Sequence, residues 1–261
     1  MNIQPNLSWR FLRVWWRNVI VYRRIWKINF LVPLFEPAFY IFAFGLGFRN
    51  LVGRLSYAGL NLSYTEFIAP ALIATAVMWN SFFETTYASF VRMIYQKTFD
   101  AMIATPLSLE EIILAEVIWS ATKAAAAAAI MLVVLAPLGF ISLPAGFLVI
   151  PLAFLGGIAF GAIGMLFTGI VPSIDMFNLP IFLFLTPLFL FSGTFFPVSS
   201  LPLWAQKASL AFPLYHLVEM TRLFSIGRME TVPLFSIGYL ILFSVVFLKL
   251  AMLAMRRRLI Q

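Results

Sequence analysis

The sequence predicts an all-α polytopic membrane protein with six membrane-spanning helices. Of its 261 residues, 62% are hydrophobic and 11% are charged, with a mean hydropathy of +0.97. Soluble domains carry about 25% charged residues, so this composition indicates a chain embedded in lipid. Long apolar runs also alternate with short polar segments along the chain. We expect a single transmembrane domain, 1–261, with an interfacial helix at 8–28 and a six-span bundle at 29–255.

Residue usage excludes several kinds of site. Cysteine is absent, which excludes disulfides and thiolate metal sites. His216 is the only histidine, so we expect no histidine-rich metal site within one chain. The net charge of +8 is concentrated at the two ends of the chain. This distribution favours an anionic cytoplasmic leaflet over nucleic acid as the partner.

Residues 8–28 predict a helix that lies in the membrane interface. Basic residues recur at steps of three, four and seven and share one helical face, while aromatic and apolar residues line another. The basic face holds Arg10, Arg13, Arg17, Arg24 and Lys27, and the other face holds Phe11, Trp15, Val19, Tyr22 and Trp26. A cleavable signal peptide is excluded because arginines interrupt the segment throughout and no small-residue cleavage site follows.

Six apolar runs predict the membrane spans. Their approximate ranges are 28–48, 64–90, 109–138, 148–171, 179–196 and 232–255. The third is longer than about 30 Å of hydrocarbon requires, so we expect its first turns to project into the cytosol with Glu110, Glu111 and Glu116. Gly157 and Gly161, four residues apart in the fourth span, predict a close helix contact.

Three charged residues fall inside these spans. They are Glu36 in the first, Glu84 in the second and Lys123 in the third. A charged side chain at this depth usually faces protein or water. For Lys123 we expect mainly a structural role, either snorkelling to an interface or pairing with a carboxylate.

The most polar internal stretch, 95–116, separates the second and third spans. We expect a short helix from Thr98 to Ala104, broken at Pro106 because proline disfavours helix in the preceding residue. Ser108 and Glu111 have the spacing of a capping box that restarts the helix. Such a surface helix, rigidly joined to a span, could transmit force from a cytosolic partner. An ordinary polar loop that happens to be helical remains the alternative.

Residues 197–231 predict two short helical pieces, broken at Pro202 and Pro213. Each piece is too short to cross a membrane, so a re-entrant or interfacial pair is expected. Of the 18 basic residues, twelve fall on the side that holds both termini and five on the opposite side. The positive-inside rule therefore puts both termini in the cytoplasm and this helix pair outside.

Two stretches carry a resemblance to a known family. They are KTFDAMIATPLSLEEIILAE at 97–116 and SGTFFPVSSLPLWAQKASLAFPLYHLVEMTR at 192–222. Together with the order of the elements over nearly the whole chain, they resemble the permease subunits of type-2 ABC exporters. Within that family the chain is most similar to the nodulation protein J type, which serves lipo-oligosaccharide export. It is also similar to polysaccharide and drug-export permeases.

The resemblance implies a homodimer in a bacterial inner membrane, with two separate ATPase subunits that bind ATP and Mg²⁺, and no cofactor on this chain. The absence of a GxxxxGK[ST] phosphate loop agrees with this. A coupling helix at 97–104 would sit in a groove of the ATPase, and 201–213 would form part of an outer gate. The implied coupling residues are Lys97, Thr98, Phe99, Asp100, Met102, Pro106, Ser108 and Glu111. The implied gate residues are Pro197, Leu201, Pro202, Trp204, Pro213, Tyr215 and His216.

The substrate expected from the sequence is an amphipathic, lipid-linked oligosaccharide. Phenylalanines gather near the outer end of the fifth span, where they could contact acyl chains or sugar rings or simply face lipid. Candidate residues of the translocation path are Glu36, Glu84, Lys123, Phe189, Phe191, Phe195 and Phe196. Export of a hydrophobic drug or a polysaccharide is the alternative.

Two other classes of protein are more distant possibilities. A membrane-embedded transferase would use His216 with Glu219, the only histidine–carboxylate pair at helical spacing. A proton-coupled secondary transporter would use Glu36 or Glu84, although no internal repeat is evident.

Overall fold

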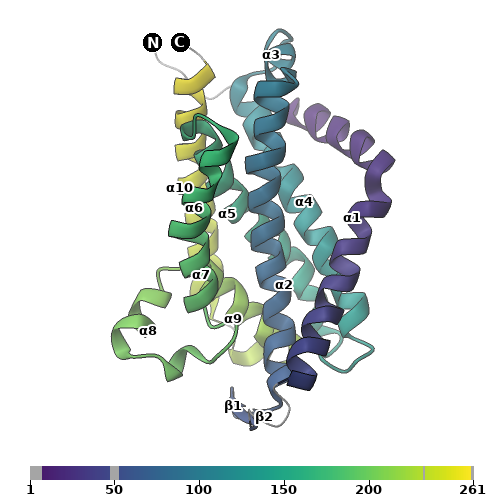
Figure 1. Ribbon diagram of the computed structural model, residues 1–261, viewed down its shortest axis with the longest axis vertical. Coiled ribbons are helices and arrows are strands. Elements are labelled where there is room, and N and C mark those ends of the chain that lie inside the picture. The colour runs from purple at the N-terminus through teal and green to yellow at the C-terminus, as the bar shows by residue number, and fades with distance from the viewer. Residues whose placement is uncertain (1–7, 48–52, 232, 260–261) are drawn as a thin grey trace.

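The computed structural model describes residues 8–47, 53–231 and 233–259. Within them, the side chain of Thr231 and several side chains between 28 and 46, including that of Glu36, lie outside the described part. The start of α1 and the end of the last helix lie at one end of a helical bundle, together with α3 (Thr98–Ile103). We call this the terminal end (Figure 1). A β-hairpin marks the opposite end, the hairpin end.

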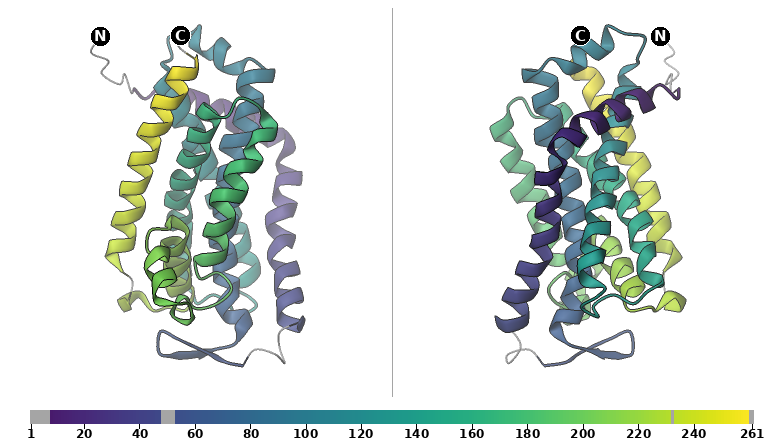
Figure 2. Two further views of the ribbon diagram at one scale, coloured as in Figure 1. Left: turned by 60° about the vertical axis from the view of Figure 1, so that its left-hand side comes forward. Right: turned by 90° about the vertical axis from the view of Figure 1, so that its right-hand side faces the viewer.

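The N-terminal helix α1 (Phe11–Gly47) is continuous over 37 residues. Its first part crosses the terminal end of the bundle, and its remainder turns and runs toward the hairpin end (Figure 2). The predicted interfacial helix and first span are therefore two parts of one bent helix.

Five helical segments in the described part are long and apolar enough to cross a membrane. They are Tyr64–Tyr95, Leu109–Leu135, Ala145–Ile170, Ile174–Phe191 and Leu234–Leu259. They correspond to the second to sixth predicted spans. Helix α1, which contains the predicted first span, is not among them.

The second span is longer than predicted. A capping box of Ser63 and Glu66 starts α2 (Tyr64–Phe83), and two π-helical turns, η1 (Glu84–Ala88) and η2 (Val91–Tyr95), continue it. The predicted end at Phe90 is wrong by five residues. Arg92, which the sequence assigned to a loop, therefore lies within the helical segment.

The third and fourth spans pack closely together. Helix α4 (Leu109–Leu135) contacts α5 (Val149–Ile170), which follows the short turn η3 (Ala145–Leu148). A Cβ added at Gly157 would lie 2.6 Å from Ala121 Cα, and one added at Gly161 would overlap Ser120 Oγ. The contact predicted from the spacing of these glycines is confirmed, because only the missing side chains let the two backbones approach this closely.

Short helical elements make up the fifth span, and further short elements lead from it to the last helix. The fifth span consists of η4 (Ile174–Phe177), α6 (Asn178–Pro180), η5 (Ile181–Leu185) and α7 (Thr186–Phe191). After it come η6 (Val198–Ser200), α8 (Leu203–Ser209), α9 (Pro213–Ser225), η7 (Met229–Thr231) and α10 (Leu234–Leu259). The predicted breaks are confirmed, since Pro202 caps α8 and Pro213 starts α9.

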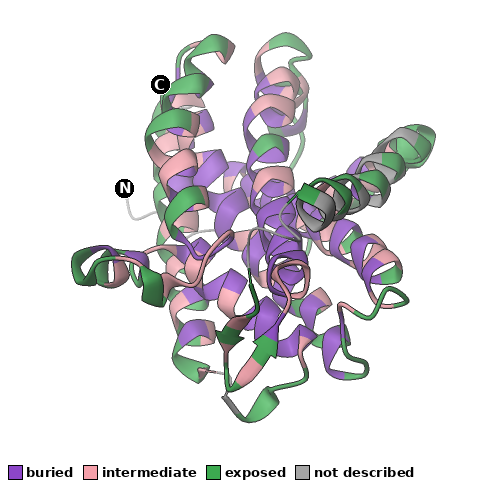
Figure 3. Ribbon diagram, turned by 60° about the horizontal axis from the view of Figure 1, so that its bottom comes forward, coloured by how far each residue is buried: buried purple, intermediate pink, exposed green. Residues whose placement is uncertain are grey.

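The hairpin joins β1 (Leu55–Tyr57) to β2 (Leu60–Leu62) in an antiparallel pair with Leu55 opposite Leu62. Ala58 and Gly59 both have positive φ, 49° and 75°, as a type I′ turn requires. The sequence predicted only a loop here. Seen from this end, the buried residues gather where the central helices face one another, and exposed residues predominate on α8 (Figure 3).

The core consists of two clusters of buried side chains. One cluster includes Leu72, Leu132 and Leu217 of α2, α4 and α9. The other includes Phe99 of α3 and Ile112 of α4, and it reaches Met255 near the end of α10. Helix α3 is thus anchored in the same core as the ends of two membrane spans.

Candidate functional site

Helix α3 presents a polar surface at the terminal end of the bundle. Lys97 precedes it with a left-handed backbone (φ 54°), which reverses the chain after η2. Phe99 and Met102 are buried, whereas Lys97 and Asp100 are exposed and 3.9 Å apart. Ile103, the last residue of the helix, is exposed. Phe99 and Met102 hold the helix in place, and its charged residues remain exposed to a partner.

The junction between α3 and α4 also holds the N-terminal segment. Ser108 Oγ accepts from the backbone N–H of Glu111 (3.2 Å), and Glu111 Oε2 accepts from the backbone N–H of Ser108 (2.9 Å), so the predicted capping box is confirmed. Glu111 Oε1 accepts from the backbone N–H of Ser8 (3.0 Å) and from its hydroxyl. Arg10 Nη1 donates to the Pro106 carbonyl (2.7 Å). The start of α1 is therefore clamped to the α3–α4 junction.

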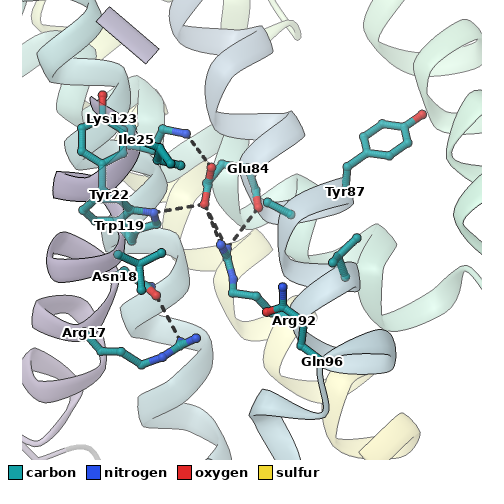
Figure 4. Close-up of a pocket in the computed structure, with 13 residues that line it drawn as sticks. Arg17, Asn18, Tyr22, Ile25, Glu84, Tyr87, Arg92, Gln96, Trp119 and Lys123 are labelled. Carbon is teal, nitrogen blue, oxygen red and sulfur yellow. Dashed lines mark hydrogen bonds and ion pairs between the residues drawn. The ribbon is translucent and has the colours of Figure 1, made fainter. Parts of the chain in front are cut away.

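A network of charged side chains lies inside the bundle near this junction (Figure 4). Glu84 on η1 accepts from Lys123 Nζ at 2.7 Å and from Trp119 Nε1 at 3.0 Å, both on α4. Arg92 on η2 donates to Glu84 at 3.0 Å and to Glu116 at 2.5 Å. Of the two alternatives expected for Lys123, the structure shows the pairing with a carboxylate.

Glu116 completes this network and connects it to α1. Its two oxygens accept from Asn18 Nδ2 (3.0 Å) and Ser89 Oγ (2.8 Å) as well as from Arg92. Glu111 and Glu116, in the turns predicted to project into the cytosol, are only 2% and 0% exposed, so their side chains are buried against other parts of the chain. Both face neighbouring segments that supply hydrogen-bond donors, while Glu110 is half-buried.

A pocket of about 510 Å³, the polar pocket, opens beside the network between α1, η1, η2 and α4. Arg17, Arg92 and Lys123 line it against a single carboxylate, Glu84, so its wall carries an excess of positive charge. Burial lowers the pKa of Arg17, and the Glu116 carboxylate opposes that shift. The polar pocket offers hydrogen-bond donors to an anionic or hydroxyl-rich group.

A second hollow of about 440 Å³, the aromatic hollow, adjoins the polar pocket and shares Glu84 and Lys123 with it. Trp79, Phe83 and Tyr87 line it from successive turns of one helical face. The Trp79 and Phe83 rings stack at 5.3 Å, and Trp79 also meets the edge of Phe189 at 6.3 Å. The two hollows together place charge beside aromatic surface.

A buried arginine connects the elements of the hairpin end. Arg222 on α9 donates to the carbonyls of Phe67 (3.0 Å) and Gly193 (2.8 Å), and its guanidinium lies over the Phe67 ring. Glu219 is 3.8 Å from Arg222 and accepts from the Tyr57 hydroxyl at 2.5 Å. Burial, and then the Glu219 charge, raise the pKa of Tyr57.

His216 is a buried side chain with both ring nitrogens bonded. Nε2 lies 2.9 Å from the Leu210 carbonyl, and Nδ1 lies 2.9 Å from Ser236 Oγ. Since a carbonyl only accepts, Nε2 carries the proton and Nδ1 accepts. Burial lowers the pKa of His216, opposed by the bond to Leu210. The histidine–carboxylate pair considered for a transferase is not hydrogen-bonded, because Glu219 binds Tyr57.

Comparison with known proteins assigns the family. The sequence profile described as ABC-2 type transporter matches residues 10–225. This chain belongs to the ABC-2 type transporter family. Nodulation protein J of Rhizobium leguminosarum bv. trifolii is 37% identical over 257 residues, covering 98% of this chain and 97% of that protein. Its counterpart in Sinorhizobium fredii is 34% identical over 258 residues, covering 99% and 97%.

A more distant relative is the inner membrane transport permease YadH of Escherichia coli. It is 24% identical over 245 residues, which cover 93% of each chain. The chain is therefore an ABC-2 permease of the nodulation protein J type, a membrane transport subunit of an ABC exporter. The family implies partnership with an ABC ATPase.

The predicted site residues of this ABC-2 permease fall into three groups. The coupling residues lie together at α3 and its junction with α4. The predicted gate residues are divided: Pro213 and His216 are buried, Pro197, Leu201 and Tyr215 are half-buried, and Pro202 and Trp204 are exposed. Among the path candidates, Glu84 and Lys123 meet, Phe189 and Phe195 are in ring contact at 5.0 Å, Phe191 is exposed, Phe196 is half-buried, and the side chain of Glu36 is outside the described part.

Sequence reasoning missed several residues of the site. Arg92, Asn18 and the α2 aromatic residues Trp79 and Phe83 were not singled out, and Glu116 was named only as a residue of the projecting turns. A polar residue inside an apolar run was the available signal for Glu116. The period of four from Trp79 to Tyr87 could have indicated the aromatic face.

Proposed function

We propose that this chain is the membrane-spanning permease of an ATP-driven exporter for an amphipathic lipid-linked oligosaccharide resembling a nodulation factor. The observation that carries the proposal is the adjacency of the polar pocket and the aromatic hollow, which share Glu84 and Lys123 in their linings. A ligand with a polar part and an acyl part requires both kinds of surface in reach of one another.

The polar pocket would receive the polar part of the substrate in the cytoplasm or inner leaflet. Arg17, Arg92 and Lys123 provide donors for sugar hydroxyls and for any anionic substituent. The aromatic hollow would take acyl chain or sugar rings, for which Trp79 and Phe83 provide apolar faces. The resemblance to the nodulation protein J type, which serves lipo-oligosaccharide export, implies this class of substrate.

ATP and Mg²⁺ would be bound by two separate ATPase subunits, and two copies of this permease would form the transport path. Helix α3 would seat in the ATPase through its exposed face around Lys97 and Asp100. The part of α1 from residue 28 onward would supply the first of the six spans. By the positive-inside rule, the terminal end would lie on the cytoplasmic side of a bacterial inner membrane. The pair α8 and α9 would then form an outer gate.

The test is transport in proteoliposomes that contain this chain and its ATPase. Fluorescent lipo-oligosaccharide, a hydrophobic dye and the free oligosaccharide are compared, each with ATP or with a proton gradient alone. We expect ATP-dependent movement of the lipo-oligosaccharide. Phe83→Ala should slow it about tenfold, as expected for loss of an aromatic contact, whereas Phe147→Ala, which removes an exposed ring elsewhere (59% exposed), should leave it unchanged.

Other outcomes identify the alternatives. Movement of the dye alone indicates drug export, and movement of the free oligosaccharide alone indicates polysaccharide export. Transport driven by the proton gradient without ATP indicates a secondary transporter. Chemical conversion of the lipo-oligosaccharide without movement indicates a transferase.

A further inference from the structure

A second apolar surface with arginines lies far from the polar pocket. A groove of about 610 Å³ runs between the end of α5 and the last turns of α10 at the terminal end. A Cβ added at Gly169 would lie 2.8 Å from Ala254 Cβ, so the two helices touch at the floor of the groove. Ile170 and Leu253 on its walls are 61% and 57% exposed. The groove therefore presents apolar surface to whatever surrounds the bundle.

Two arginines close the terminal end of this groove, and they differ in their contacts. Arg258 donates to the carbonyls of Thr168 (2.6 Å) and Val171 (2.5 Å), so it is held at the end of α5. Arg257 is exposed, and within residues 8–47, 53–231 and 233–259 it has no hydrogen-bond or ion-pair partner. No acidic residue lines the groove among the described residues. The guanidinium of Arg257, with unused hydrogen-bond donors, thus lies at the terminal end of an apolar groove.

We propose that this groove binds one anionic phospholipid, with its phosphate on Arg257 and an acyl chain along Ile170 and Leu253. The planar fork of an arginine matches a phosphate in a bidentate arrangement. Basic pockets between membrane helices at the end of a span suit anionic lipid headgroups. The proposal concerns a lipid resident on the permease and is independent of what the permease exports.

A second copy of the chain is a less favourable occupant of this groove. In a two-fold interface each patch meets its own counterpart. The triplet Arg256–Arg258 of one copy would then lie against the same triplet of the other. Removing these like charges from water without partners is costly, whereas a lipid phosphate supplies the opposite charge.

The experiment is native mass spectrometry of the full chain in a neutral detergent, titrated with phosphatidylglycerol, phosphatidylcholine or inorganic phosphate. We expect a one-lipid adduct with phosphatidylglycerol and at least tenfold weaker binding of phosphatidylcholine. Arg257→Gln should weaken phosphatidylglycerol binding about tenfold, the effect of losing a charge-assisted contact. Arg256→Gln, the adjacent arginine that does not line the groove, should change it less than twofold.

A second variant tests the acyl chain. Leu253→Gln should weaken binding of long-chain phosphatidylglycerol and leave binding of a short-chain form unchanged. Equal losses in the two arginine variants would mean a diffuse positive field and would overturn the proposal. Binding of inorganic phosphate as tight as that of the lipid would mean a free-anion site. Conversion of a dimer to a monomer in Arg257→Gln, with lipid binding intact, would assign the groove to a second copy.

Discussion

Arg92 Nη2 and Glu116 Oε2 lie 2.5 Å apart and join the end of the second span to the start of the third. Glu116 is wholly buried, and Asn18 of α1 bonds its other oxygen. One carboxylate thus holds three helical segments together next to α3. Because α3 follows directly after η2, which carries Arg92, we expect a movement of α3 relative to the bundle to reach these bonds.

Glu116→Ala should strongly destabilise the fold. The substitution leaves Arg92 with one carboxylate fewer and removes one hydrogen-bond acceptor each from Asn18 and Ser89. Breaking one side of a buried ion pair costs about 3–5 kcal/mol of unfolding free energy, measurable by denaturant unfolding in detergent. Glu110→Ala, on the same helix but half-buried, should cost less than about 0.5 kcal/mol. Equal losses of unfolding free energy in Glu116→Ala and Glu110→Ala would contradict a specific role of this network.

Glu111→Ala should release the N-terminal segment. It removes a capping box, which costs about 1–2 kcal/mol, and also the bonds to Ser8. Trypsin should then cleave at Arg10 faster than in the unaltered protein. Glu66→Ala is the matched control, because it removes the capping box of α2 without touching the N-terminal segment. Faster cleavage at Arg10 in both variants would mean general loosening.

Asp100→Ala should separate ATP hydrolysis from transport and leave stability unchanged. Asp100 is exposed, and its 3.9 Å pair with Lys97 contributes little. Phe99→Ala, by contrast, leaves a cavity at a fully buried position and should lower the free energy of unfolding by about 3–5 kcal/mol. ATPase rate, transport and unfolding are measured on the same preparations. Unaltered transport in Asp100→Ala would remove the coupling role of this residue.

His216 should make stability depend on pH. Burial lowers its pKa below the ordinary value of 6.5, so the unfolded chain binds more protons than the folded one below that pH. Its contribution is therefore complete above about pH 6.5 and is lost as the pH falls. Unfolding temperatures between pH 5 and 8 measure this. His216→Gln should remove the histidine part of the dependence, and an identical profile in that variant would contradict the assignment.

Local signals predicted much of the fold. The capping box at Ser108 and the glycine spacing at Gly157 and Gly161 were interpretable because each acts within one or two helical turns. The breaks at Pro202 and Pro213 follow from the missing N–H of proline.

The site was less predictable because its contacts join distant parts of the chain. Ser8 and Glu111 are 103 residues apart, and Arg92 reaches Glu116 only because π turns extend the second span. The hairpin was missed since Ala58, not asparagine or aspartate, precedes Gly59 in the turn.

The two carbonyls that Arg222 binds have a consequence for how the hairpin end can move. They belong to Phe67, in the first turn of α2, and to Gly193, just beyond α7. Moving α9 away by itself would leave a buried cation and two carbonyls without hydrogen-bond partners in a poorly hydrated space. A displacement that preserves these bonds instead carries the beginning of α2, the end of α7 and α9 as one rigid cap.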